Sequence, residues 1–282
     1  MSDQNCYRHP NNETGIVCQR CDRSICTSCM HQASVGFHCP ECVKSSKQKV
    51  YTANSLPGAS GTVTRALVGL NAAAFVLAIA VLGSTVGGAG LAARDFGLWG
   101  PAIDVDTEWW RIITSGFLHS GLIHIAFNMY LLWQLGQQLE RAMGQIDFVL
   151  VYFVTLIGGS TGALLLSPNS FTVGASGAVF GLIGVMVLFL RSRNIGLFDT
   201  GLGMLIVINA IFSLRGGVSL GGHLGGFVTG VILGILYFGL NPGDGPLLKG
   251  KTKETRSITI GLGVVLFGAA IAAAGTWQAP LF

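Results

Sequence analysis

The chain has 282 residues, of which 50% are hydrophobic and only 11% are charged, with a formal net charge of +4. Soluble domains carry about 25% charged residues, so this composition excludes an ordinary soluble protein and predicts an integral membrane protein. The small net charge does not indicate nucleic-acid binding, and the 41 glycines fit helices that pack closely in lipid.

The first predicted element is a metal-binding segment, because all seven cysteines fall between Cys6 and Cys42. With one histidine they form four pairs of two-residue spacing, which are Cys6 with His9, Cys18 with Cys21, Cys26 with Cys29, and Cys39 with Cys42. Eight ligands suit two tetrahedral zinc ions. The short gap after Cys21 predicts that pairs one and three bind one zinc and pairs two and four bind the other.

Two alternatives to this ligand set remain open. A disulfide framework requires an oxidising compartment and leaves one of the seven thiols over. His38, beside Cys39, could also replace one thiol as a zinc ligand. In either zinc arrangement every coordination position is filled by protein, so the metal is expected to be structural.

Residues 1–43 are therefore predicted to form a zinc-binding module, which resembles a B-box-type zinc finger. Such modules usually bind proteins, so the resemblance implies a cytoplasmic protein partner. Residues 44–63 follow as a polar linker.

Residues 64–277 contain seven apolar stretches, most of them long enough to cross a bilayer. We expect transmembrane helices at about 64–86, 117–135, 148–166, 173–190, 197–214, 218–240 and 257–277. The long connection after the first stretch carries Trp110 and Arg111 and is predicted to pack as a structure of its own at the interface. Basic residues in the loops favour the N-terminal side by eleven to three, which predicts a cytoplasmic N-terminus. Reduced thiols in the zinc module agree with that compartment.

Polar residues inside three of these spans predict the functional site. Ser176 lies about three residues into the fourth span, in Gly174-Ala175-Ser176-Gly177, and alone it is more typical of helix packing. His124 and Asn128 lie in the second span and His223 in the sixth, where ionisable groups commonly mark function. These three spans run in the same direction, so the serine and both histidines are expected about 5 to 10 Å below the outer surface.

These residues predict acyl-transfer chemistry. Ser176 is the candidate nucleophile, and His223 is the candidate base and later acid, oriented by packing against Phe180. His124, Asn128 and the Ser176 backbone N–H are candidate donors to an oxyanion. His119, five residues before His124, is expected to point elsewhere on the helix.

Four glycines are predicted to support this site by allowing close backbone approach. Gly174 and Gly177 flank the serine. Gly226 and Gly230 form a Gly-x-x-x-Gly pair that would place the sixth span against the fourth.

Taken together, the motifs resemble the rhomboid family of intramembrane serine proteases over about residues 64–277. They are Trp110-Arg111, His119…His124-x-x-x-Asn128, Gly174-x-Ser176-Gly177 and His223-x-x-Gly226-x-x-x-Gly230. The resemblance implies an all-α fold with a six-helix core around an outward-opening, water-filled cavity, with the seventh span as an extra C-terminal helix. It also implies a Ser176–His223 dyad, an oxyanion site at His124 and Asn128, and a partly embedded Trp110-Arg111 loop. Several members have tyrosine where this chain has Phe180, so any role of that hydroxyl is absent here.

The expected function is cleavage of transmembrane segments of membrane proteins near the outer face, without a catalytic cofactor and with two structural zinc ions. The expected location is a bacterial plasma membrane. One alternative is an inactive rhomboid-like protein that binds membrane clients; loss of Ser176 or His223 would mark it, and both are present. A transporter is a second alternative, which predicts acidic partners within the spans, and the predicted spans contain none near the serine.

Overall fold

The computed structural model describes residues 5–33, 35–45, 61–81, 90–213, 217–248, 250 and 252–278. The chain divides into two units, Met1–Leu56 and Pro57–Phe282, and each is described here by itself. Most of the predicted linker at 44–63 lies outside the described residues. The first helix of the second unit already begins at Thr62.

The N-terminal unit consists of two small antiparallel hairpins and one short helix. Strand β1 (Asn5–Cys6) pairs with β2 (His9–Glu13), and β3 (His31–Gln32) pairs with β4 (Phe37–His38), before helix α1 (Pro40–Ser45). Ile25 is the only large aliphatic or aromatic side chain that is fully buried in the described part of this unit, and cysteines form most of the remaining core. So small an apolar core cannot stabilise a domain of this size without further crosslinks.

The second unit is helical, and each of the seven predicted spans overlaps one principal helix. These are α2 (Thr62–Ala80), α6 (Leu122–Met143), α7 (Gln145–Leu166), α8 (Ser176–Ser192), α9 (Leu202–Ser213), α10 (Leu220–Phe238) and α11 (Thr252–Ala274). Short helices occupy the connections: α3 (Gly90–Phe96), α4 (Gly100–Asp104), α5 (Arg111–Thr114), η1 (Ser115–Phe117), η2 (Phe198–Thr200) and η3 (Gly275–Gln278).

Four of the described helices, α2, α7, α10 and α11, are long and apolar enough to cross a membrane. A fifth span is counted if the segment Arg111–Phe117 and α6, which meet at a bend of 97°, are taken together. Helices α8 and α9 are apolar but shorter, with 17 and 12 residues. The structure thus has four to five membrane-spanning helices by length and composition, and the expectation of seven crossings stays a prediction.

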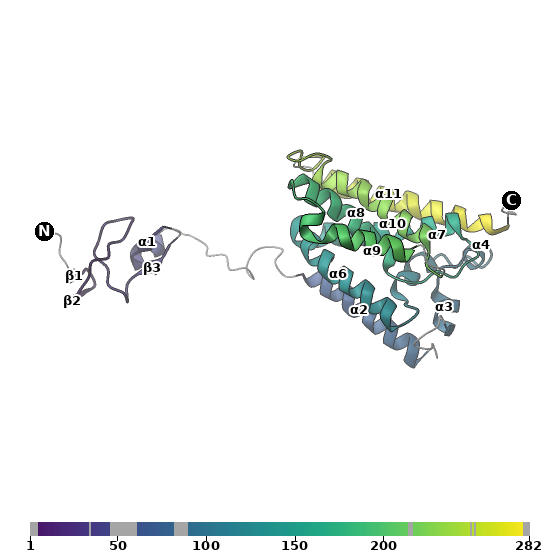
Figure 1. Ribbon diagram of the computed structural model, residues 1–282, viewed down its shortest axis with the longest axis horizontal. Helices are drawn as coiled ribbons and strands as arrows, with labels where there is room; N and C mark the ends of the chain where they lie inside the picture. Colours follow the sequence, from purple (N-terminus) through teal and green to yellow (C-terminus); the bar gives the residue numbers. More distant parts are fainter. Residues whose placement is uncertain are drawn as a thin grey trace. The chain divides into compact units, whose positions relative to one another are not determined.

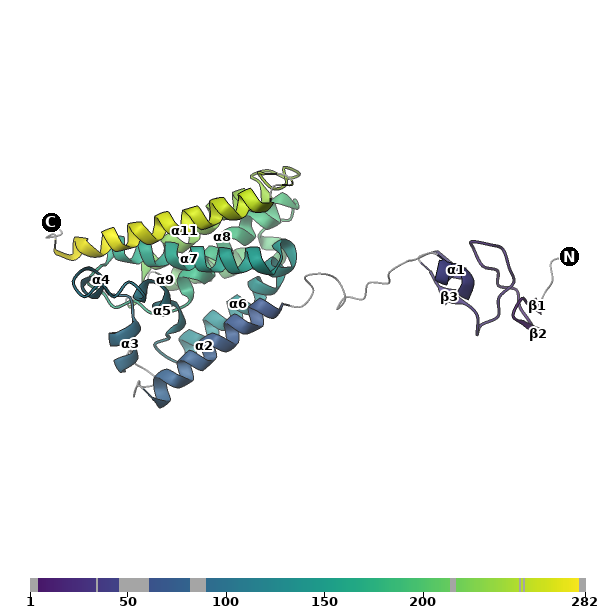
Figure 2. The same ribbon diagram turned by 180° about the vertical axis from the view of Figure 1, so that it is seen from behind.

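Helices α8 and α10 lie in the middle of the helical unit. Figures 1 and 2 show α2 and α6 side by side along one edge and α11 along the opposite edge, with α7, α8 and α10 between them. Helix α10 makes its most extensive contacts with α8 and α7. The largest cluster of buried apolar side chains joins α6, α7, α8 and α10, and includes Leu132, Phe148, Leu182 and Leu233.

Two buried carboxylates lie within helices that extend beyond the predicted spans. Glu140, near the end of α6, accepts hydrogen bonds from the Val63 and Thr64 N–H groups at 3.1 and 2.9 Å and so caps α2. Asp147, in the first turn of α7, pairs with Arg256 of α11 at 2.7 Å and accepts from the Tyr237 hydroxyl at 3.2 Å. Both carboxylates therefore hold helices together at the helix ends remote from Ser176.

Candidate active site

Ser176 is the first residue of α8 and so lies at a helix N-terminus. The sequence had instead predicted a position about three residues inside a helix. Backbone hydrogen bonds fix the preceding loop, with the Gly174 N–H donating to the Ser115 carbonyl at 2.9 Å. Gly174 has φ of 131°, which side-chain-bearing residues rarely adopt, and a Cβ there would lie 2.8 Å from the His124 ring. Because the first N–H groups of a helix have no intrahelical acceptor, backbone donors are available beside the serine.

His223 lies in the first turn of α10, and its imidazole is held on two sides. The Phe180 ring of α8 stacks on it with centroids 4.0 Å apart and 12° between the planes. On the other side, the Ser213 Oγ of α9 is 2.6 Å from Nδ1. The side chain is only 9% exposed, so these two neighbours define the orientation of the ring.

Facing glycines bring α8 and α10 close together. A Cβ at Gly226 would collide with the carbonyl oxygen of Gly177, and one at Gly230 would collide with that of Gly181. This approach places Phe180, one turn after Ser176, against His223. No hydrogen bond joins the Ser176 hydroxyl to His223 in the described chain, and such bonds are often long until substrate binds.

His124 lies in the first turn of α6 with its ring beside the serine loop. Its Nδ1 accepts from the Ser120 N–H at 3.4 Å and lies 3.0 Å from Ser120 Oγ. A ring nitrogen that accepts from a backbone N–H carries no proton, so the proton of the neutral ring is on Nε2. The Nε2–H edge is the one that a Cβ at Gly174 would meet, so His124 presents a donor toward the segment that holds Ser176.

Asn128 and His119 both contact His124. Asn128 is buried, and its Nδ2 donates to the His124 carbonyl at 3.0 Å, which leaves one amide N–H for a ligand. The prediction that His119 points away from His124 was wrong, because the two rings contact edge to face with centroids 5.1 Å apart. His119 precedes the start of α6 at Leu122, so helical spacing does not apply to it.

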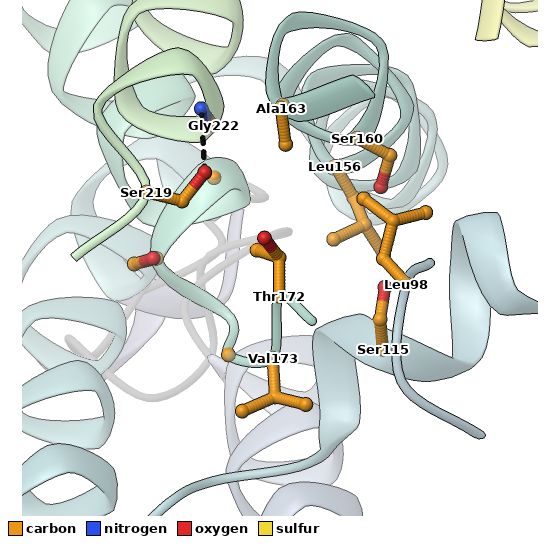
Figure 3. A pocket seen from close by; sticks show the side chains of 13 residues that line it. Leu98, Ser115, Leu156, Ser160, Ala163, Thr172, Val173, Ser219 and Gly222 are labelled. Atoms are coloured by element: carbon orange, nitrogen blue, oxygen red, sulfur yellow. Dashed lines mark hydrogen bonds between the residues drawn. The ribbon is translucent and has the colours of Figure 1, made fainter. Parts of the chain in front are cut away.

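A small pocket lies beside the serine (Figure 3). Helix α7 supplies Leu156, Ser160 and Ala163, the loop supplies Thr172 and Val173, and Ser219 with Gly222 closes one side. Two of its hydroxyls are already engaged: Ser219 Oγ accepts from the Gly222 N–H at 3.2 Å, and Ser160 donates to the Ile112 carbonyl at 2.8 Å. The pocket admits a small group, such as water or a short side chain, next to Ser176.

Trp110 precedes α5 and Arg111 begins it, outside the predicted Ser176–His223 dyad. Arg111 is 5% exposed, forms an ion pair with Glu108, and donates to the carbonyls of Arg94 and Gly97 at 2.7 and 2.9 Å. It therefore ties α3 to α5. Trp110 is exposed, as expected for a side chain at a membrane interface.

The N-terminal unit brings the eight predicted ligands into two groups. Cys6, His9, Cys26 and Cys29 form one, and Cys18, Cys21, Cys39 and Cys42 form the other, with the ligand atoms of each group within 4.8 Å of one another. This is the interleaved arrangement of pairs. All seven thiols are free, and His38, in β4, belongs to neither group.

The geometry of these groups fits zinc. Zn–S bonds of about 2.3 Å in a tetrahedron separate two sulfurs by about 3.7 Å. The Cys21 and Cys39 sulfurs are 3.7 Å apart, and His9 Nδ1 lies 3.3 Å from both the Cys26 and Cys29 sulfurs. The residues present could therefore hold two zinc ions.

Local hydrogen bonding already favours the thiolate form of some ligands. Burial raises the pKa of the Cys6 thiol, but backbone N–H groups of Arg8 and Cys26 and the His9 ring outweigh it and lower the pKa to about 6. Burial likewise opposes ionisation of Cys18, yet the backbone N–H groups of Cys39 and Arg20 contribute to lowering its pKa to about 6. Thiolates are the form that binds metal.

Comparison with known proteins identifies the family to which the helical unit belongs. The Rhomboid domain signature matches residues 106–240. The chain is 35% identical over 134 residues to a Bacillus subtilis protein named "Putative rhomboid protease YdcA", covering 46% of this chain and 67% of that one. The chain belongs to the rhomboid family.

Other relatives share only part of their length with this chain. "Rhomboid protease GluP" of Bacillus subtilis is 32% identical over 170 residues, which cover 57% of this chain and 32% of GluP. "Inactive RHOMBOID-like protein 8" of Arabidopsis thaliana is 35% identical over 119 residues, covering 42% of this chain and 34% of the relative. The chain thus spans about a third of the length of each of these curated relatives.

Sequence reasoning missed two residues of the site, Ser120 and Ser213. Ser120 precedes the start of α6 at Leu122, so helical spacing could not have indicated its contact with His124. Ser213 is four residues after Asn209 on an otherwise apolar stretch, and that polar pair was the available signal.

Proposed function

We propose that the helical unit is an intramembrane serine endopeptidase with Ser176 and His223 as its catalytic dyad. The observation that carries the proposal is the His223 imidazole, stacked on Phe180 and hydrogen-bonded to Ser213, on a helix that packs through Gly226 against the serine-bearing helix. Family membership supports a peptide-bond hydrolase acting on membrane proteins within the bilayer.

In the proposed reaction, the Ser176 hydroxyl attacks the scissile carbonyl carbon while its proton passes to His223 Nε2. The new Oγ–C bond creates a tetrahedral intermediate with a negative oxygen. That intermediate collapses by breaking the C–N bond, and the imidazolium gives its proton to the leaving amine. Water then hydrolyses the acyl-enzyme with His223 again as base, which restores the serine and releases the new carboxyl group.

The oxyanion is proposed to bind at the start of α8. The Ser176 N–H, the Nε2–H of His124 and the remaining Nδ2–H of Asn128 are the proposed donors of this site. Aligned backbone dipoles give a helix N-terminus a partial positive charge, which favours an anion there.

An inactive client-binding protein is the second candidate, favoured by the similarity to a relative named as inactive. That candidate requires no proton acceptor at Nε2 of His223 and no donor array around the serine. The protease requires a base at His223 and donors around the serine, and the contacts of His223 with Ser213 and of His124 with Ser120 support both, so the protease is the better-supported proposal.

We also propose a substrate class and a membrane orientation. Substrates are single-span or multi-span membrane proteins cut near the outer face, and the active site opens outward, with the N-terminus in the cytoplasm. The charge distribution of the loops supports this orientation. A bacterial plasma membrane is proposed as the location.

The N-terminal unit is proposed to be a B-box-like module with two structural zinc ions that binds a cytoplasmic protein partner. Each group has four ligands, which would fill a tetrahedral zinc site and leave no open position for catalysis. It would recruit or regulate, while the helical unit performs the chemistry.

The experiment is incubation of the purified full-length protein in liposomes with a generic single-span substrate. Wild type should cut it, and Ser176→Ala and His223→Ala should not. Ser192→Ala is the matched control, because that hydroxyl donates only to the Phe189 carbonyl at 2.7 Å, at the far end of α8. Wild-type cleavage by Ser176→Ala would overturn the proposal; binding of substrate without cleavage by wild type would favour the inactive alternative.

A further inference from the structure

We propose that Ser213 is a positioning residue that holds His223 in the tautomer required of a general base. This inference rests on the proposed dyad and deepens it. The starting observation is that Ser213 Oγ is within hydrogen-bond distance of two groups: His223 Nδ1 at 2.6 Å and the Asn209 carbonyl oxygen at 2.7 Å.

The direction of both bonds follows from the number of protons available. A carbonyl oxygen only accepts hydrogen bonds, and a serine hydroxyl has one proton to donate. The Ser213 proton is therefore used toward Asn209, and its oxygen must accept from His223. Nδ1 consequently carries the proton of the neutral imidazole.

This assignment leaves Nε2 with a free lone pair, which is what proton abstraction from Ser176 requires. In serine proteases with a third group, that group accepts from the Nδ1–H of the base and fixes its tautomer and orientation. Ser213 occupies the corresponding place here, as a neutral acceptor. It is 5% exposed, so water has little access to replace it.

Ser213 and Phe180 restrain the ring in different ways. The stacked Phe180 fixes the plane of the imidazole but does not distinguish its two nitrogens. Only a directional partner at Nδ1 makes that distinction. The pairing thus connects α9, which carries Ser213, to the proton transfer at α8 and α10.

The test uses the full-length protein in detergent micelles or liposomes, with Ser213→Ala, the near-isosteric Ser213→Cys and the hydroxyl-retaining Ser213→Thr. General-base catalysis contributes about 100- to 10,000-fold, and the stacked Phe180 remains. Ser213→Ala and Ser213→Cys should therefore lower kcat by about 10- to 100-fold, well within that range. KM should stay within about twofold, Ser213→Thr should recover most of kcat, and Ser192→Ala should match wild type.

The structural readout is the ¹⁵N spectrum of histidine-labelled protein, with His223 assigned through His223→Ala. Wild type should show neutral His223 protonated at Nδ1, and Ser213→Ala should show a mixture of tautomers. An unchanged tautomer, or wild-type kcat in both Ser213→Ala and Ser213→Cys, would overturn the role of Ser213. If Ser176→Ala or His223→Ala kept activity in the same assay, the dyad itself would fall, which distinguishes the two failures.

Discussion

At the residue scale, we assign opposite tautomers to His124 and His223, because a serine N–H donates to Nδ1 of the first and a serine hydroxyl accepts from Nδ1 of the second. Ser120 places an N–H against Nδ1 of His124, which leaves Nε2–H as a donor. Ser213 accepts from Nδ1–H of His223, which leaves Nε2 as a base. In the proposed mechanism, a histidine in α6 thus stabilises the oxyanion and a histidine in α10 acts as the base.

The donor role of His124 leads to the first prediction. His124→Ala should lower kcat by about 100- to 1000-fold, the usual cost of removing one oxyanion donor, and should change KM little. Steady-state kinetics on a fluorogenic transmembrane substrate measures both parameters. A rise in KM with unchanged kcat would move His124 to substrate binding.

Asn128 is expected to contribute less than His124. One of its two amide protons is already used by the His124 carbonyl, and two other donors remain for the oxyanion. Asn128→Ala should therefore reduce kcat less than His124→Ala in the same assay. A greater loss, with the thermal unfolding midpoint unchanged, would make Asn128 the principal donor.

Candidate catalytic residues could be predicted from the sequence where a polar side chain interrupts an apolar stretch, as Ser176, His124 and His223 do. The residues that orient the two histidines, Ser120 and Ser213, could not be predicted. Serine is common in membrane helices, and the pairing of Ser213 with His223 exists only because α9 returns beside the start of α10. The position of His119 was mispredicted because the chain bends by 97° before α6, and no residue spacing reveals that bend.

At the element scale, the close approach of α8 and α10 is the feature on which the site depends. Gly226→Ala would place a methyl group against the Gly177 carbonyl oxygen. Overpacking of this kind costs about 1–3 kcal/mol, and any relief by separating the helices would move His223 away from Ser176. Gly226→Ala should therefore lower cleavage activity strongly while lowering the thermal unfolding midpoint only moderately.

The matched control for that prediction is Gly261→Ala in α11, where an added Cβ meets nothing within 4 Å. It should leave both activity and the unfolding midpoint at wild-type values. Equal activity of Gly226→Ala and Gly261→Ala would show that helix contact at Gly226 does not set the geometry of the dyad.

The sequence predicted the presence of each principal helix better than the residues at which it begins and ends. Apolar stretches located all seven principal helices, but Ser176 begins its helix instead of lying inside it, and α9 is much shorter than its apolar stretch. The loop before Ser176 is fixed by Gly174 and its bond to Ser115, which hydropathy does not register. In the proposed mechanism, that loop leads into the helix N-terminus that binds the oxyanion.

At the scale of the whole molecule, the proposed reaction requires a substrate that presents an extended peptide bond to Ser176. An α-helix hides its carbonyl groups in hydrogen bonds, so Gly, Ala or Pro near the outer end of a substrate helix should favour cutting. Replacing those residues by Leu in a cleaved substrate should suppress cleavage, as gel analysis of the products would show. Unchanged cleavage would mean that the substrate helix need not open.

The N-terminal unit should depend on metal while the helical unit does not. Full-length protein should contain two zinc ions per chain by elemental analysis, and Cys6→Ser or Cys18→Ser should each remove one; His31→Ala, outside both groups, should keep two. Because metal binding supplies most of the folding free energy of such small modules, chelation should unfold this unit. Cleavage of a generic substrate should persist.

Deletion of residues 1–50 should likewise alter the choice or location of substrates and leave the chemistry intact. Disulfide-paired thiols with no zinc would contradict both the module and its cytoplasmic placement. Loss of all cleavage in the deletion would mean that the N-terminal unit contributes to the fold of the helical unit.

The central claim is that His223 activates Ser176 as a nucleophile, and covalent trapping tests it most directly. The full-length protein in liposomes is treated with a fluorophosphonate, which modifies activated serines, and the labelled residue is located by peptide mass spectrometry. The account predicts one adduct on Ser176, abolished by His223→Ala and retained by Ser192→Ala. Substrate cleavage by protein that carries no adduct on Ser176, or equal labelling of Ser176 in His223→Ala, would contradict it.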